Sequence, residues 1–222
     1  MCFSANASFT LGAVLISTGI FSIIRANKSN KNYIFLALIP LFFGIQQIIE
    51  GIVWWQLYGN KSPSSSFWIY FYLFFALYFW PAFIPLCTYR IEQNTTRKKV
   101  LAGFMIAGMI LGSIIYVPLL LGIISTKAII VGQCIQYIVN QSNTISWLYS
   151  IGYILIITMS LLLSSIPKIK LLGILIFISA TISYCWYFYA FTSTWCFFAA
   201  AISIYIAYIM FQYPSVVKQT DD

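Results

Sequence analysis

Histidine is absent from this 222-residue chain, and charged residues are scarce. Without an imidazole group the chain cannot form a Ser-His-Asp triad, a histidine-ligated zinc hydrolase centre or a histidine-ligated haem site. Charged residues make up 7% of the chain, whereas about a quarter of an ordinary globular domain is charged. The composition therefore excludes several common catalytic classes and is not that of a water-soluble domain.

Apolar residues dominate instead, with 61% of the chain hydrophobic and 19% aromatic. They form runs of about 20 residues or more, the length needed to cross the hydrocarbon core of a bilayer. We predict an all-α integral membrane bundle, one domain over residues 1–222, with seven transmembrane helices at about 7–24, 33–58, 67–89, 100–124, 145–166, 171–191 and 195–213. The net charge of +8 lies in the short loops between these runs, a pattern of membrane topology and not of nucleic-acid binding.

The basic residues also predict the orientation, because cytoplasmic loops are enriched in lysine and arginine. Most of them follow the first, third and fifth predicted helices or lie in the C-terminal tail: Arg25, Lys28, Lys31, Arg90, Arg97, Lys98, Lys99, Lys168, Lys170 and Lys218. Only Lys61 and Lys127 lie on the opposite side. We expect the N-terminus outside and the C-terminus in the cytoplasm. The first run has its positive charges after it, the reverse of a signal peptide, so it should remain as a helix.

Two further stretches carry structural signals. Gly108 and Gly112 have the small-xxx-small spacing that lets neighbouring helices approach closely. Between residues 125 and 144, polar side chains interrupt the hydrophobicity, and this loop is expected to form either a short strand pair or an interfacial segment.

Glu50 lies in the outer third of the second predicted helix. Gln46, Gln47 and Trp54 are three or four residues away and share its face. An ionised acid inside a bilayer is energetically costly, so Glu50 either carries a proton or is stabilised by hydrogen bonds that it accepts. Acidic residues inside a membrane usually have a function, and the alternative is that Glu50 only holds helices together through hydrogen bonds. We predict an outward-facing polar pocket around Glu50, with further binding residues from other segments: Ser4, Asn6, Tyr184 and Trp195.

Four of the five cysteines fall in the outer half of the predicted bundle, namely Cys2, Cys134, Cys185 and Cys196. Their spacing is not that of a metal site. They either form a disulfide in an oxidising compartment or act as small apolar residues in the core. No metal site and no particular cofactor is predicted.

Three stretches resemble a known family: MCFSANASF at residues 1–9, FGIQQIIEGIVW at 43–54 and STWCFFAA at 193–200, with Phe79-Trp80-Pro81 between them. They are similar to a family of small bacterial polytopic membrane proteins of unknown function. The resemblance implies a multi-pass protein of the bacterial cytoplasmic membrane. It implies no activity.

Three functions compete. The first is binding or transport of a small molecule, proton or cation at Glu50, with the bilayer and this ligand as the expected partners. The second is a membrane-embedded enzyme that uses Glu50 as acid or base with an outer cysteine. The third is a receptor-like sensor that signals through a membrane partner. We favour the first, since no base or cation in the sequence would activate a thiol.

Overall fold

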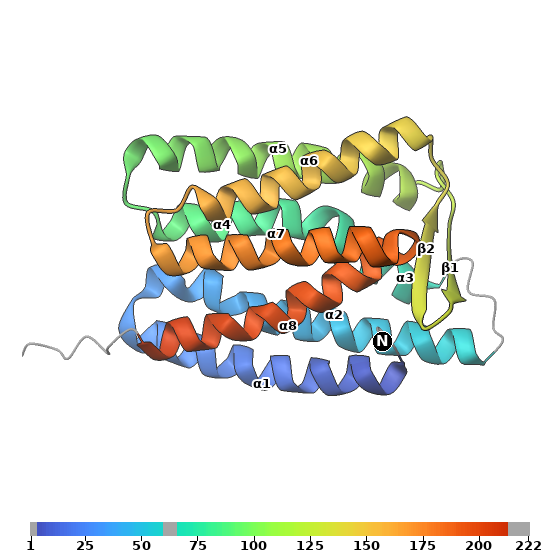
Figure 1. The fold of residues 1–222 in the computed structure, drawn as a ribbon, viewed down its shortest axis with the longest axis horizontal. Coiled ribbons are helices and arrows are strands. Elements are labelled where there is room, and N and C mark those ends of the chain that lie inside the picture. Colours follow the sequence, from blue (N-terminus) through green and yellow to red (C-terminus); the bar gives the residue numbers. More distant parts are fainter. Residues whose placement is uncertain (1–3, 60–65, 213–222) are drawn as a thin grey trace, which may run out of the picture.

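The computed structural model describes residues 4–59 and 66–212 as a helical bundle closed at one end by a β-hairpin (Figure 1). Its elements are α1 (Ala5–Ser29), the 3₁₀ helix η1 (Lys31–Tyr33), α2 (Ile34–Tyr58), α3 (Phe67–Leu73), the π-helix η2 (Phe74–Phe79), α4 (Trp80–Ile91), α5 (Thr95–Leu120), β1 (Thr126–Val131), β2 (Cys134–Val139), α6 (Asn143–Leu162), α7 (Pro167–Tyr187), the 3₁₀ helix η3 (Phe188–Ala190) and α8 (Phe191–Gln212). The helices run along the long axis of the molecule, and α2 and α3–α4 form its most buried part.

Six helical segments of the described chain are long and apolar enough to cross a membrane. The sequence predicted seven helices. The difference lies in the last segment, residues 167–212, which is continuous from α7 through η3 into α8. Figure 1 shows α7 and α8 running back along each other after η3. The bundle is compatible with a multi-pass membrane protein.

The observed helix ends differ from the predicted ones because capping, not hydropathy, determines where a helix begins. The first helix spans 5–29 instead of 7–24, since its polar end continues the helix beyond the apolar run and Ser4 caps its start by accepting the Ala7 N–H at 3.2 Å. The fourth predicted run, 100–124, is α5 at 95–120 and begins after the cap Asn94. The last three helices likewise start two to four residues earlier than predicted. α6 begins after its cap Ser142, α7 begins at Pro167, and α8 begins directly after η3.

Glycines allow the closest helix contacts. On α1 the buried residues recur every three or four positions and nearly all are small, and this stripe packs against α2. A Cβ added at Gly19 would lie 2.6 Å from the backbone nitrogen of Leu41. At Gly108 of α5 an added Cβ would lie 1.9 Å from the carbonyl oxygen of Pro81 in α4. The close packing predicted at Gly108 is therefore present, and its partner is α4.

The interrupted stretch after α5 forms the strand pair that was one of its two expected structures. β1 and β2 are antiparallel, with Thr126 opposite Val139 and Val131 opposite Cys134. The tight turn between them contains Gly132, whose φ of +61° is easily adopted only by a residue without a side chain. The hairpin lies across the end of the bundle where α2 ends and α8 begins (Figure 1).

The opposite end of the bundle is rich in positive charge. The loops from α1 to α2, α4 to α5 and α6 to α7 all lie there, together with the end of α8 (Figure 1). They and their flanking turns carry Arg25, Lys28, Lys31, Arg90, Arg97, Lys98, Lys99, Lys168 and Lys170. Lys127 lies at the other end, on β1. The charge asymmetry of the sequence is thus an asymmetry between the two ends of one bundle.

At this cationic end Glu92 is only 2% exposed. Its carboxylate accepts the backbone N–H groups of Gln93 (3.0 Å), Asn94 (2.9 Å) and Ser165 (2.7 Å), and the Ser165 hydroxyl (2.7 Å). Burial by itself opposes ionisation, but the hydrogen bonds from Asn94, Ser165 and Gln93 outweigh it and lower the pKa of Glu92 from its ordinary value. Glu92 therefore ties the α4–α5 loop to the α6–α7 loop.

Candidate functional site

The second buried glutamate, Glu50, lies toward the hairpin end. Gln46, Gln47, Glu50 and Trp54 share one face of α2, and all four side chains have zero exposure. The Ser193 hydroxyl, near the start of α8, donates to Oε1 of Glu50 at 2.5 Å. Gln47 Nε2 donates to Oε2 at 3.3 Å. The carboxylate thus joins α2 to α8 in the interior of the bundle.

Trp80 extends the cluster from α4. Its indole N–H donates to Oε1 of Gln46 at 2.8 Å, and its ring stacks on Phe43 with 3.9 Å between the centroids. Trp80 directly follows the π-helix η2. Pro81, the next residue, has no N–H for the Leu77 carbonyl four positions earlier, and the Tyr149 hydroxyl donates to that carbonyl at 2.5 Å instead. The irregular helix is therefore stabilised by α6, and Trp80 is held against α2.

Two tyrosines and a cysteine complete the cluster. The rings of Tyr72, from α3, and Tyr137, from β2, stack with 4.5 Å between centroids and 9° between planes. Both tyrosines interact electrostatically with Glu50 and with Cys196. Cys196 lies three residues after Ser193, so both face the same side of α8. The hairpin thus contributes a side chain directly to the surroundings of Glu50.

Several polar atoms of this region are buried without a hydrogen-bond partner among the described residues: Gln47 Oε1, Trp54 Nε1, Tyr137 Oη and Trp195 Nε1. Each such atom costs about 1–3 kcal/mol, and folded proteins contain few of them. They include N–H donors, a carbonyl acceptor and a hydroxyl that can do both. Their concentration beside one carboxylate indicates that this part of the fold serves something other than stability.

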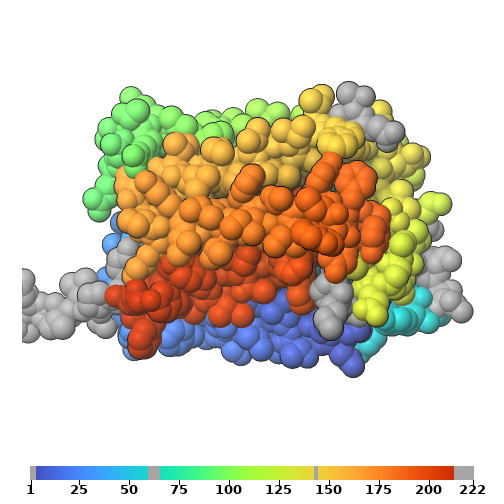
Figure 2. Space-filling view, viewed as in Figure 1, coloured from blue at the N-terminus to red at the C-terminus, as the bar shows by residue number. Residues whose placement is uncertain are grey.

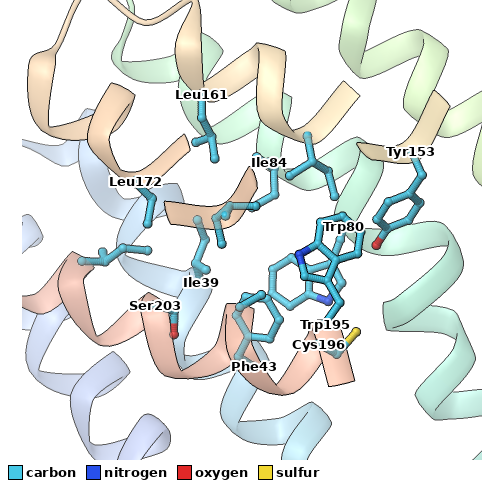
Figure 3. Close-up of a pocket in the computed structure, with 14 residues that line it drawn as sticks. Ile39, Phe43, Trp80, Ile84, Tyr153, Leu161, Leu172, Trp195, Cys196 and Ser203 are labelled. Carbon is cyan, nitrogen blue, oxygen red and sulfur yellow. The ribbon is translucent and has the colours of Figure 1, made fainter. Parts of the chain in front are cut away.

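Cavities lead to the cluster from the hairpin end. One of about 270 Å³ lies beneath the hairpin, and its walls include Tyr137, Tyr149, Tyr153, Trp195 and Cys196. A second, of about 40 Å³ and almost wholly apolar, continues into the bundle (Figure 3). Both share Tyr153, Trp195 and Cys196 as walls. We call the larger space the chamber. Glu50 lines neither cavity, but Cys196, a wall of both, interacts electrostatically with it.

The structure places the other residues predicted for the pocket in different surroundings. Trp195 is 6% exposed, lines the chamber and packs edge-on against Tyr153. Ser4 uses its side chain to cap α1, and Asn6 is exposed. Tyr184 is 39% exposed and packs against Trp147 and Phe188 on the outside of α7. Ser4, Asn6 and Tyr184 lie toward the hairpin end of the bundle, but their positions along the helices did not determine the direction of their side chains.

The cysteines do not come together as one group. Cys2 lies outside the described residues. Cys185 is an exposed free thiol and Cys196 a buried one, whereas Cys134 is buried beside Ala190 and Tyr187. Within residues 4–59 and 66–212 no group of three or more cysteine and acidic side chains is arranged to hold a metal ion. Cys185 and Cys196 are not joined to each other in this structure.

Three members of the cluster were not predicted from the sequence. Trp80 was identified only as part of the Phe79-Trp80-Pro81 motif. Tyr72 and Tyr137 carried no signal, because their position depends on the hairpin folding back over α3. Ser193 lies in the STWCFFAA stretch at residues 193–200, but that stretch did not identify it as the partner of Glu50. Trp80 lies between the irregular helix η2 and the prolines Pro81 and Pro85 of α4, and that proline pair was the clearest available signal in the sequence.

The fold and the cluster together define a helical protein compatible with multi-pass membrane insertion, in which polar side chains are buried near one end. The chain belongs to a family of unknown function, DUF6629, which matches residues 1–220. This membership agrees with the resemblance to an uncharacterised family. No curated protein and no solved structure matches the chain significantly. The function is therefore argued from the cluster itself.

Proposed function

We propose that the protein is a multi-pass protein of the bacterial cytoplasmic membrane that binds a small polar molecule, with its proton, at Glu50, reached from outside through the chamber. In this arrangement α7 and α8 cross the membrane separately. The proposal comprises seven transmembrane helices, an outer N-terminus and a cytoplasmic C-terminus.

The membrane placement is supported by length and charge. α7 has 21 residues and α8 has 22, and about 20 residues suffice for one crossing. The cationic end of the bundle fits the cytoplasmic side, where lysine and arginine are enriched. The hairpin and the chamber then face outward. Exposed aromatic residues at that end, such as Trp55 and Trp147, fit the interfacial belt.

The kind of ligand follows from the unpartnered atoms, which are the observation that carries the proposal. Ca²⁺ and Mg²⁺ are coordinated by oxygen atoms, but the cluster offers the N–H group of Trp54 and the hydroxyl of Tyr137 near the oxygen atoms of Glu50 and Gln47. Such a mixture of donors and acceptors suits a small molecule that itself has both. Transport of that molecule would additionally require the narrow apolar cavity beyond the chamber to open.

The enzyme alternative is less well supported. A reactive thiolate is stabilised by a neighbouring positive charge, whereas the charged neighbour of Cys196 is the carboxylate of Glu50. Nothing in the described chain favours the sensor alternative, and its loops at the cationic end are short.

The reactivity of Cys196 tests the proposal. Whole cells are treated from outside with a cationic and an anionic methanethiosulfonate reagent of equal size, and modification is read at Cys196 by peptide mass spectrometry. We expect modification of Cys196 with a preference for the cationic reagent, because Glu50 lies beside the thiol. The preference should disappear in Glu50→Gln.

Cys87, which is buried near the cationic end, is the internal control and should stay unmodified. If Cys196 is not modified from outside, or is modified equally by both reagents in the wild type over a range of pH, then the chamber is not an outward-facing route to Glu50.

A further inference from the structure

A second hollow, distinct from the Glu50 cluster, lies between α6 and α7 beside the hairpin. Its volume is about 520 Å³, and it is walled by Trp147 and Ser150 of α6, Phe177, Thr181 and Tyr184 of α7, and Phe188 of η3. Figure 2 shows α6 and α7 together on one face of the molecule, next to the hairpin. We call this hollow the side groove.

The side groove adjoins the chamber. Tyr137, Ser146, Ser150, Phe191 and Thr192 line both spaces. The neighbouring surface of α6 and α7 is apolar, with Leu148, Ile151 and Ile178 each about half exposed or more. In the proposed membrane placement, on which this inference rests, the side groove therefore opens sideways into the outer half of the lipid bilayer.

The walls of the side groove favour a neutral molecule with a flat ring. None of its walls within the described part of the chain is charged, so an ionised head group would have no counter-charge there in a medium where charge is expensive. Tyr184 packs edge-on against Phe188 at 5.3 Å and against Trp147 at 6.0 Å. These perpendicular rings leave faces and edges available to a further ring.

Polar atoms in the walls also favour a ligand that carries oxygen. The hydroxyls of Ser150 and Thr181 donate to carbonyls of their own helices, so their oxygen atoms are left as acceptors. The Tyr137 hydroxyl is buried at the junction with the chamber and has no partner among the described residues. It can donate to a carbonyl or accept from a hydroxyl.

We propose that the side groove binds a neutral amphiphile with a flat ring head bearing a carbonyl or hydroxyl oxygen, which arrives from the outer lipid leaflet. The ring lies among Trp147, Tyr184 and Phe188, its oxygen points toward Tyr137, and its tail remains in the lipid. A lipid-soluble molecule thereby gains a route to the chamber that does not pass through water.

Photochemical labelling tests this site. The full-length protein in phosphatidylcholine nanodiscs is illuminated with 4-octylbenzophenone, a neutral ring ketone with a tail, and labelled residues are mapped by mass spectrometry. We expect labelling concentrated on Trp147, Tyr184 and Phe188, saturating with probe and suppressed by excess 4-octylphenol. The charged analogue 4-benzoylbenzoate should not label these residues.

Matched variants separate the groove from the general lipid surface. Thr181 and Ile178 are both exposed on α7, but of the two only Thr181 is a wall of the groove. Thr181→Trp should lower groove labelling about tenfold, equivalent to about 1.4 kcal/mol of binding, whereas Ile178→Trp should leave it unchanged. Both variants must elute as the wild type does on size exclusion.

Labelling that is non-saturating, that spreads equally over the exposed face of α5, or that survives Thr181→Trp would overturn the proposal and indicate ordinary lipid contact. The Glu50→Gln protein should label like the wild type. Failure at the groove is thus distinguishable from failure of the Glu50 site, because the cysteine reactivity experiment reads the latter independently.

Discussion

The protein buries one glutamate toward each end of its bundle, and the two are held in different ways. Glu92 accepts four hydrogen bonds from backbone and side-chain groups of two loops. Glu50 accepts hydrogen bonds from Ser193 and Gln47, and around it polar atoms lack partners. At the Glu92 end the polar groups satisfy one another's hydrogen bonds, whereas around Glu50 several polar atoms have no partner among the described residues.

The difference separates a structural carboxylate from a candidate functional one. A satisfied buried network stabilises and specifies a fold, whereas a partly satisfied one costs free energy. Proteins retain such a cost where the fold has a further task. The comparison therefore yields a test that does not require the ligand. Substitutions should lower the free energy of unfolding strongly at the Glu92 end and only slightly at the Glu50 end.

The largest effect is expected from Glu92→Ala. The substitution leaves the N–H groups of Gln93, Asn94 and Ser165 without their acceptor, and the free energy of unfolding should fall by about 3 kcal/mol. Thermal unfolding in detergent micelles measures it. Gln93→Ala, whose side chain is exposed, is the control and should change little. A loss below that of the control would contradict the structural role of Glu92.

Acidification should reproduce part of this loss. The pKa of Glu92 is lower than its ordinary value of 4.5, so its stabilisation is fully present above the unfolded-state pKa and is lost as pH falls through the folded-state pKa. The melting temperature of the wild type should fall between neutral pH and the acid range. In Glu92→Gln this fall should be shallower. Equal pH profiles would show that Glu92 does not contribute.

Glu50→Gln is expected to change the free energy of unfolding by less than about 1 kcal/mol, because neutralising a buried charge is often neutral or stabilising. The Ser193 hydroxyl can donate to the new amide, and Gln47 can turn its unpartnered Oε1 toward the new N–H group. Urea or thermal unfolding compares it with Glu92→Gln. A loss as large as that of Glu92→Ala would make Glu50 a structural residue.

Tyr137→Phe should have the smallest effect. It removes a buried hydroxyl that has no partner among the described residues, so stability should stay unchanged or rise slightly. Tyr149→Phe is the matched control, since that hydroxyl donates to Leu77 at 2.5 Å and its loss should cost about 1 kcal/mol. If both variants unfold at the same temperature, the Tyr137 hydroxyl has a partner in solution.

Much of the fold was predictable because membrane-length apolar runs and helices coincide. Each predicted run corresponds to an observed helical segment, and the polar stretch after α5 is the hairpin. The boundaries were not predictable to the residue, because Ser4, Asn94 and Ser142 start helices by accepting hydrogen bonds from backbone N–H groups. Hydropathy averaged over a window of residues is insensitive to a single polar side chain.

The candidate site was predictable only within one helix. Spacing of three and four residues along α2 was enough to group Gln46, Gln47 and Trp54 with Glu50. Tyr137 and Trp80 reach the same place through a hairpin and an irregular helix, so no spacing in the sequence connects them. The role of Glu92 was missed entirely, because it depends on two loops that meet only in the folded chain.

The π-helix η2 has a consequence for how this family tolerates insertions and deletions. A π turn holds one residue more than an α-helical turn, so it offsets every later position of the segment by about 100° around the axis. Deleting a single residue within Phe74–Phe79 would let the segment wind regularly and leave Trp80 directed at Gln46, whereas regular winding without the deletion would turn Trp80 away. Relatives that keep this site should therefore have either the π turn or a regular helix with one residue fewer between Tyr72 and Trp80.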